Sequence, residues 1–193
     1  MNKLQLLEYV CSLNSLGWDV SQYLWKNPEL AGEERLSVEV FKNVLRENEF
    51  KIHEVKNVNH AFYAEYGSGH PVIGVLGEYD ALAGLSQEVC AEKKPVKEGG
   101  AGQGCGHNLL GTACLLASLG AKKLIASNRL KGTVRFYGCP AEETLQGKVL
   151  MIKNGAFENC DVALTWHPDS INANYSGGFV ALDSMKFEFN GRA

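Results

Sequence analysis

Strand-like and helix-like segments alternate along most of the chain, and this alternation is the feature that most restricts the fold. Apolar runs typical of strands occupy 50–55, 61–67, 71–82, 132–143 and 161–168. Segments of helical periodicity occupy 4–24, 36–45, 108–127 and 146–157, the first predicted as a single helix ended by Pro28. Because strands that alternate with helices form helix-covered parallel sheets, the sequence predicts an α/β three-layer sandwich around a central mixed, largely parallel sheet.

Composition is typical of a globular protein and gives no indication of nucleic acid or a membrane as a partner. Its 193 residues, 45% of them hydrophobic, are enough for one domain with a sizeable core. A formal net charge of -3 gives no basis for binding nucleic acid or a membrane surface. No apolar run approaches the roughly 18 to 20 residues that cross a bilayer, and the N-terminus lacks the apolar block of a signal peptide. We therefore expect a cytoplasmic protein whose six cysteines are free thiols or metal ligands.

Polar side chains follow the predicted strands at the points where the strands end. These stretches are "GEYD" (77–80), "CPAEE" (139–143) and "TWHP" (165–168). A fourth stretch, "CGH", carries Cys105 and His107 just before a helical segment, at the end of a loop that begins near residue 84. In open α/β sheets ligands bind outside the carboxyl ends of the strands, so the four stretches are predicted to meet at one place.

The glycine-rich stretch "GQGCGHNLLGTA" (102–113) admits several chemical roles. A phosphate-binding loop is excluded, because no GxGxxG leads from a strand into a helix and no GxxxxGK[ST] occurs. A nucleophilic Cys105, with His107 or His167 as its base, agrees with flanking glycines that expose the thiol. That interpretation leaves Glu142 and Glu143 without a role.

A metal site accounts for more of these residues. Cys105 and His107 stand two positions apart, so in extended backbone their side chains share a face. Glu142 and Glu143 on a strand tip point in different directions, so one can bind a metal while the other faces a bound water. With His167 added, the donors form a mixed set that suits zinc or manganese. From the residues alone, an ordinary role as solvated or hydrogen-bonded side chains stays open.

The order of the motifs resembles the M20 family of metallopeptidases and amidohydrolases. The motifs are "NPEL" followed by "GEE", then "GEYDALAGLSQ", "GQGCGHNLLGTA", "RFYGCPAEE" and "LTWHP". The resemblance covers nearly the whole chain and is strongest to the branch with a cysteine metal ligand, of the aminobenzoyl-glutamate hydrolase type. It implies a metal-dependent amidohydrolase that cleaves the amide bond of N-acyl or aminobenzoyl amino acids, or of dipeptides, with a metal-activated water.

The resemblance also implies a role for each candidate residue. The implied ligands of two divalent ions, manganese or zinc, are Cys105 as the bridge, His107, Glu143 and His167. Glu142 would be the catalytic base and acid, and Asp80 would steady a ligand. Glu78 stands where other branches have a metal-binding histidine, and its role stays open. Thr144 departs from the glycine that usually follows the two glutamates.

The chain resembles only the N-terminal part of this family. Residues 1–184 would be part of the metal-dependent catalytic domain, and 185–193 the start of a strand that enters a lid or dimerisation domain. A final histidine ligand would come from the return of the chain after that domain. Through the lid we expect a homodimer or a related hetero-oligomer. The alternative function is a non-catalytic relative that binds metal or an acylated amino acid without turnover.

Overall fold

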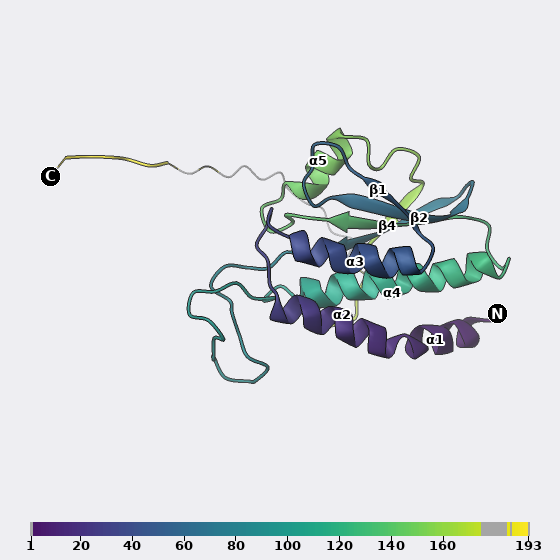
Figure 1. Ribbon diagram of the computed structural model, residues 1–193, viewed down its shortest axis with the longest axis horizontal. Coiled ribbons are helices and arrows are strands. Elements are labelled where there is room, and N and C mark those ends of the chain that lie inside the picture. The colour runs from purple at the N-terminus through teal and green to yellow at the C-terminus, as the bar shows by residue number, and fades with distance from the viewer. Residues whose placement is uncertain (1, 175–184, 186, 193) are drawn as a thin grey trace.

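The computed structural model describes residues 2–174, 185 and 187–192. Its helices are α1 (Lys3–Ser12), α2 (Asn14–Lys26), α3 (Arg35–Glu47), α4 (His107–Ala126) and α5 (Gly147–Lys153). Its strands are β1 (Lys51–Glu54), β2 (Phe62–Ser68), β3 (Val72–Glu78), β4 (Gly132–Cys139) and β5 (Val162–Leu164). Helices α1 to α4 lie on one face of the sheet and α5 lies on the other (Figure 1). The predicted three-layer α/β sandwich is confirmed.

The sheet is mixed, and its parallel part carries the predicted site. Its strand order is β1-β2-β4-β3-β5. Strand β1 pairs antiparallel with β2, and β2 antiparallel with β4, whereas β3 pairs parallel with both β4 and β5. The parallel pairing is therefore confined to β4, β3 and β5. The carboxyl ends of these three strands lie at one edge, which is where "GEYD", "CPAEE" and "TWHP" follow them.

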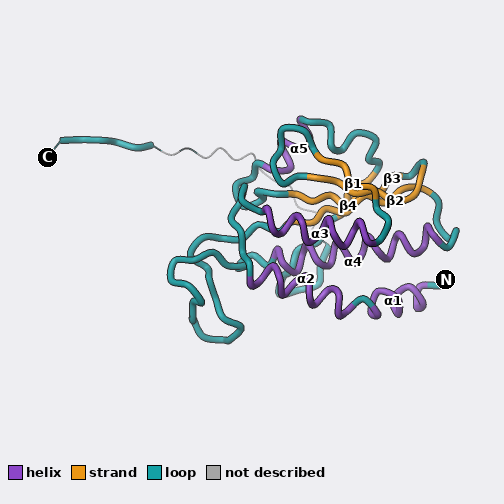
Figure 2. The backbone as a smooth tube through the Cα atoms, in the orientation of Figure 1, coloured by secondary structure: helices purple, strands orange, loops and turns teal. Residues whose placement is uncertain are grey.

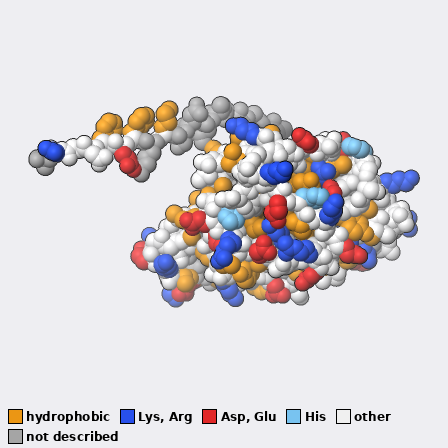
Figure 3. Space-filling model, turned by 45° about the horizontal axis from the view of Figure 1, so that its top comes forward, with side chains coloured by type: hydrophobic (Ala, Val, Ile, Leu, Met, Phe, Trp, Pro, Cys, Tyr) orange, Lys and Arg blue, Asp and Glu red, His pale blue; other side chains and the backbone are white. Residues whose placement is uncertain are grey.

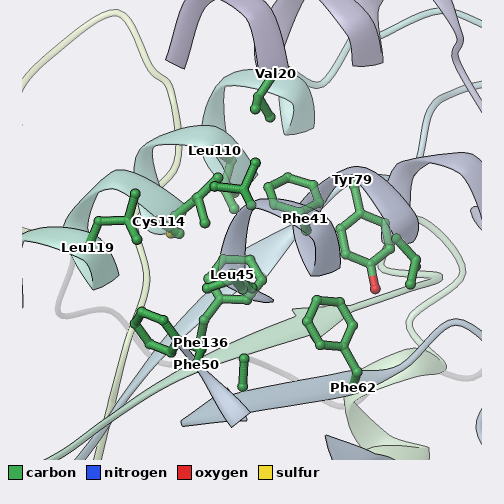
Figure 4. Packing of buried hydrophobic residues seen from close by; sticks show 14 of the residues in the cluster. Val20, Phe41, Leu45, Phe50, Phe62, Tyr79, Leu110, Cys114, Leu119 and Phe136 are labelled. Carbon is green, nitrogen blue, oxygen red and sulfur yellow. The ribbon is translucent and has the colours of Figure 1, made fainter. Parts of the chain in front are cut away.

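Alternating side chains of β4 build a separate core on each face of the sheet. Phe136 is fully buried and faces the helices, where its ring centroid lies 5.4 Å from that of Phe41 on α3 (Figure 4). The next residue, Tyr137, faces α5 and packs in a second buried cluster with Met151. This period of two is what a strand covered on both faces requires. The two cores hold α4 and α5 against opposite faces of the sheet.

The predicted helix over 4–24 is wrong in one respect, because it is broken into α1 and α2 at Leu13. Leucines at a spacing of three drift by about 60° per step around a helix of 3.6 residues per turn, so one straight helix cannot keep them on one side. Helix α2 buries Val20 and Leu24 against the core, whereas no residue of α1 is buried. Helix α2 ends at Lys26, two residues before Pro28, as predicted.

Helix α4 is the central helix of the helical layer. It contacts β3 and β4 on one side and α1 and α2 on the other. A Cβ on Gly111 would lie 2.4 Å from the carbonyl oxygen of Glu78, so glycine there lets α4 approach the end of β3. By length and composition α4 is apolar enough to cross a membrane, contrary to the expectation that no such run exists. Its packing shows it to be a core helix.

Two segments without helix or strand lie apart from the packed layers. Residues 84–106 form the long loop that the sequence predicts, and it projects from the helical layer (Figure 2). Residues 185 and 187–192 extend away from the domain and expose hydrophobic side chains, namely Met185, Phe187 and Phe189 (Figure 3). Residues 175–184, on which the predicted domain boundary falls, lie outside the described residues. The strand and lid expected beyond that boundary stay predictions.

Candidate metal centre

His107, the first residue of α4, has one nitrogen bound and one free. Its Nδ1 lies 2.9 Å from Oδ1 and 3.0 Å from the backbone oxygen of Asp80, and both oxygens are acceptors. Nδ1 therefore carries the proton in the neutral ring and donates it to Asp80. Nε2 is buried and has no hydrogen-bond partner. A neutral histidine binds a metal through the lone pair of such an unprotonated nitrogen.

The free nitrogen of His107 faces three carboxylates. Oε2 of Glu78 lies 3.2 Å from Nε2, Oε2 of Glu142 lies 3.7 Å away, and Oε1 of Glu143 lies 3.9 Å away. Oε1 of Glu143 is likewise buried without a hydrogen-bond partner. Two unpartnered buried atoms of this kind cost free energy unless a further group binds them. A divalent cation would satisfy both, so the side chains fit a metal.

Cys105 and His167 complete the cluster from a second side. Sγ of Cys105 lies 3.3 Å from Nε2 of His167. The candidate ligand atoms of Cys105, His107 and His167 all lie within 4.8 Å of one another. Gly106 makes this approach possible, because it has a φ of 81° and a Cβ there would lie 2.8 Å from Cγ of Pro168. All six cysteines are free thiols, as expected.

Asp80 connects the histidine to the glutamate turn. The Asp80 side chain is fully buried, and while Oδ1 faces His107, Oδ2 accepts a hydrogen bond of 2.8 Å from the backbone N–H of Glu143. One carboxylate therefore fixes the ring of His107 and the backbone of the candidate ligand that follows β4. Neighbours that orient metal ligands in this way also raise their basicity.

The turn that carries the two glutamates is anchored by a distant segment. Ala141 has a φ of 50°, a left-handed conformation that is unfavourable for alanine. Its backbone N–H donates a 2.6 Å hydrogen bond to Oε1 of Glu34, which is fully buried at the start of α3. Burial raises the pKa of Glu34, whose Oε2 has no partner. The hydroxyl of Thr144 donates to the Ala141 carbonyl and closes the turn.

Burial and neighbouring charges shift the pKa values of several site residues. Burial raises the pKa of Glu142, and the nearby Glu78 carboxylate raises it further. Burial also raises the pKa of Cys105, to about 12, with added repulsion from Glu143. Burial lowers the pKa of His107, but Asp80, Glu78 and Glu143 outweigh it, so the net shift is upward. The thiol of Cys105 therefore holds a proton that a cation bound to its sulfur would displace.

The structure brings all six predicted site residues together and adds three others. Two sets of candidate ligand atoms share His107, one with Cys105 and His167 and the other with Glu78 and Glu142. Glu143 belongs to neither set, although its Oε1 also faces His107. The residues that sequence reasoning left without a role are Glu78, Glu34 and Lys148, whose ammonium binds Glu78. The only sequence feature that pointed to Glu34 is the "GEE" motif in which it stands. No sequence feature pointed to Lys148.

A cavity of about 680 Å³ lies between α2 and the long loop. Trp25 and Leu30 line one wall, and Val89 and Val96 line the other. None of the six predicted site residues lines it. The cluster itself opens to solvent through Cys105, Glu142 and His167, which are only partly buried or exposed.

Fold and cluster together define an α/β protein with a candidate metal centre at the carboxyl edge of its sheet. No family model matches the chain. The chain is 44% identical over 177 residues to one of the subunits of p-aminobenzoyl-glutamate hydrolase from Escherichia coli, covering 91% of this chain and 37% of that protein. It is 31% identical over 187 residues to Xaa-Arg dipeptidase of Mus musculus, covering 90% of this chain and 39% of that protein.

A solved structure agrees with the fold. A dinuclear metal binding peptidase of the M20 family from Bacillus subtilis superposes with a TM-score of 0.68 at 23% identity, covering 79% of this chain and 42% of that one. The homologues and structural neighbours of this chain are members of the M20 family of peptidases and amidohydrolases. The chain spans 37 to 39% of the length of the first two relatives named above.

Proposed function

We propose that the protein is a metal-dependent amidohydrolase that cleaves N-acyl or aminobenzoyl amino acids. The observation that carries the proposal is Nε2 of His107, buried without a partner and facing Glu78, Glu142 and Glu143. The relatives support the same reaction class, since one is named a hydrolase of p-aminobenzoyl-glutamate and the other a dipeptidase. Both names describe cleavage of an amide bond to an amino acid.

In this proposal the residues around His107 hold two divalent ions, manganese or zinc. The ligands are Cys105, His107, Glu143 and His167. When bound, such ions polarise the scissile carbonyl and lower the pKa of a water molecule. Asp80 acts on the ligands and not on the substrate, because it binds Nδ1 of His107 and the N–H of Glu143. Its role is to hold both in one orientation.

Glu142 is the proposed proton carrier. Its side chain is partly exposed, so it reaches both the cluster and a substrate that enters from solvent. Burial, with the Glu78 carboxylate beside it, raises its pKa above the value of a free glutamate. A base of this kind takes a proton from the attacking water and returns it to the leaving amine, a contribution of about 10² to 10⁴-fold.

Two measurements on the purified protein test this function. The first is elemental analysis after incubation with Mn²⁺ or Zn²⁺ and desalting, with His107→Asn as the control that should lose metal. The second is release of p-aminobenzoate from p-aminobenzoyl-glutamate. Bound metal with hydrolysis supports the proposal. Bound metal without hydrolysis of this or other N-acyl amino acids supports the non-catalytic alternative, and wild-type protein that retains no metal contradicts the metal-dependent amidohydrolase.

We also propose a cytoplasmic location and an oligomeric enzyme. The Escherichia coli relative is named as a subunit, which makes a hetero-oligomer as compatible as a homodimer. Light scattering of the protein purified alone tests this point. A dimeric mass supports the homodimer, whereas a monomer that gains mass only with a second gene product supports the hetero-oligomer.

A further inference from the structure

Glu78 is a buried carboxylate at the candidate centre to which no role has been assigned. It ends β3 and is 6% exposed. Its Oε2 lies 3.2 Å from Nε2 of His107. Its other oxygen, Oε1, accepts a hydrogen bond from the ammonium of Lys148. The Glu78 carboxylate is therefore held between a candidate metal ligand and a lysine.

Lys148 is the charge partner of this group of carboxylates. It is the second residue of α5, and its side chain is 29% exposed. Among the described residues it is the only lysine or arginine that forms an ion pair with Glu78, Asp80, Glu142 or Glu143. Helix α5 thus places one fixed positive charge beside the centre, from the face of the sheet opposite α4.

A cation at the centre would change the surroundings of Glu78. A histidine binds a metal through an unprotonated nitrogen, so Nε2 of His107 would then face the cation and offer no partner to Glu78. Without Lys148, Glu78 would become a free carboxylate next to a divalent ion, and it would bind that ion. The contact with Lys148 does not depend on His107 and remains when the metal is present.

We propose that Lys148 is a positioning residue that pairs with Glu78 and keeps this carboxylate out of the ligand set. The inference rests on the proposed metal centre. The pair has no net charge, so Glu78 stays beside His107 without adding attraction for the cation. Glu142 then remains the one carboxylate near Nε2 that is neither a proposed ligand nor neutralised, which keeps it available for proton transfer.

The sign of the electrostatic effect gives a sharp test. Lys148→Met keeps the length and apolar stem of the side chain and removes its charge, so the region gains a net charge of one negative unit. A divalent ion should then bind more tightly, by roughly tenfold. Lys148→Arg, which keeps the charge and the hydrogen bond, should bind metal as the wild type does. Lys153→Met, an exposed lysine on the same helix, is the matched control.

The experiment is calorimetric titration of the metal-free protein with Mn²⁺ and, separately, with Zn²⁺. Glu78→Gln combined with Lys148→Met should return the affinity to near the wild-type value, because a neutral pair replaces a neutral pair. Glu78→Gln alone should weaken binding, since it leaves an unpaired ammonium beside the cation. If Lys148→Met does not fold, the metal affinity of Glu78→Gln alone tests the proposal.

Other outcomes would overturn the inference. If Lys148→Met binds metal as tightly as the wild type or more weakly, and only its melting temperature falls, the role of Lys148 is to stabilise the packing of α5. Tighter binding that persists in the double variant would mean that Lys148 does not act through Glu78. Because substrate is absent from this titration, a failure to hydrolyse amides leaves the result intact. A wild-type protein that binds neither metal rejects the centre itself.

Discussion

The carboxylate of Asp80 and the imidazole of His107 lie 2.9 Å apart, from Oδ1 to Nδ1, and both side chains are fully buried. The contact joins the loop after β3 to the first residue of α4. It fixes which ring nitrogen carries the proton and leaves the other facing the carboxylates of the cluster. The most direct prediction concerns the loss of this contact.

Asp80→Ala is expected to weaken metal binding by about 10- to 100-fold, the usual effect of removing a group that orients a metal ligand. Asp80→Asn should lose less, because its amide oxygen can still accept from His107 although its NH₂ group cannot accept from Glu143. Metal titration of both variants measures the difference. Equal affinities in Asp80→Ala and wild type would show that His107 needs no orientation or binds no metal.

The two adjacent glutamates are predicted to differ in function. Glu142→Gln should keep its metal and lose about 10² to 10⁴-fold in kcat, because proton transfer is lost while the proposed ligands remain. Glu143→Gln should lose metal, since Oε1 of Glu143 is the buried and unpartnered atom of the pair. Elemental analysis beside the hydrolysis assay separates the two effects. The reverse pattern would mean that the roles of Glu142 and Glu143 are exchanged.

The metal affinity should rise with pH. Burial raises the pKa of the Cys105 thiol to about 12, and carboxylates keep the pKa of His107 above its usual value despite its burial. The Cys105 thiol therefore holds its proton near pH 7, and binding of a metal to its sulfur must release that proton. Each proton released makes the affinity rise by up to about tenfold per pH unit below the relevant pKa.

A Cys105→Asp variant checks the source of this dependence. An aspartate has largely lost its proton by pH 6, so the slope of affinity against pH should fall by about one proton. Cys11→Ser, which changes an exposed thiol on α1, should keep the wild-type slope. Titrations between pH 6 and pH 8 in buffers of different ionisation enthalpy count the protons. An unchanged slope in Cys105→Asp would remove Cys105 from the ligand set.

The meeting of the site residues could be predicted because it follows from strand direction. Asp80, Glu142 and His167 each follow one of the parallel strands β3, β4 and β5, whose carboxyl ends share an edge. A buried strand and a polar residue just after it are both visible in sequence. The strand ends therefore predict the position of the cluster, and the residue types predict its chemistry.

The contacts that hold the cluster in place were not predictable in the same way. Lys148 and Glu78 are 70 residues apart, and Glu34 and Ala141 are 107 apart. Glu34 and Lys148 stand at helix starts, where a charge is ordinarily solvated, so no local pattern marks either of them as part of the site. The left-handed conformation of Ala141 could not be predicted from sequence either, because the residue that usually indicates this conformation is glycine.

Glu34 provides the last prediction. Glu34→Ala removes the acceptor for the buried N–H of Ala141, which should lower the free energy of unfolding by about 1 to 3 kcal/mol. The turn would also lose the contact that holds Ala141 in its left-handed conformation, so kcat should fall as Glu142 moves. Glu34→Gln keeps an acceptor oxygen and should retain most of both properties, since burial already favours the uncharged form of this side chain.

Urea unfolding and steady-state hydrolysis of p-aminobenzoyl-glutamate measure the two effects of Glu34→Ala. Glu33→Ala is the control, because it removes the neighbouring carboxylate, which is exposed and makes no contact with Ala141. A loss of stability with unchanged kcat would mean that Glu34 supports the fold and not the position of Glu142. Full retention of both, as in Glu33→Ala, would mean that the turn holds its conformation without Glu34.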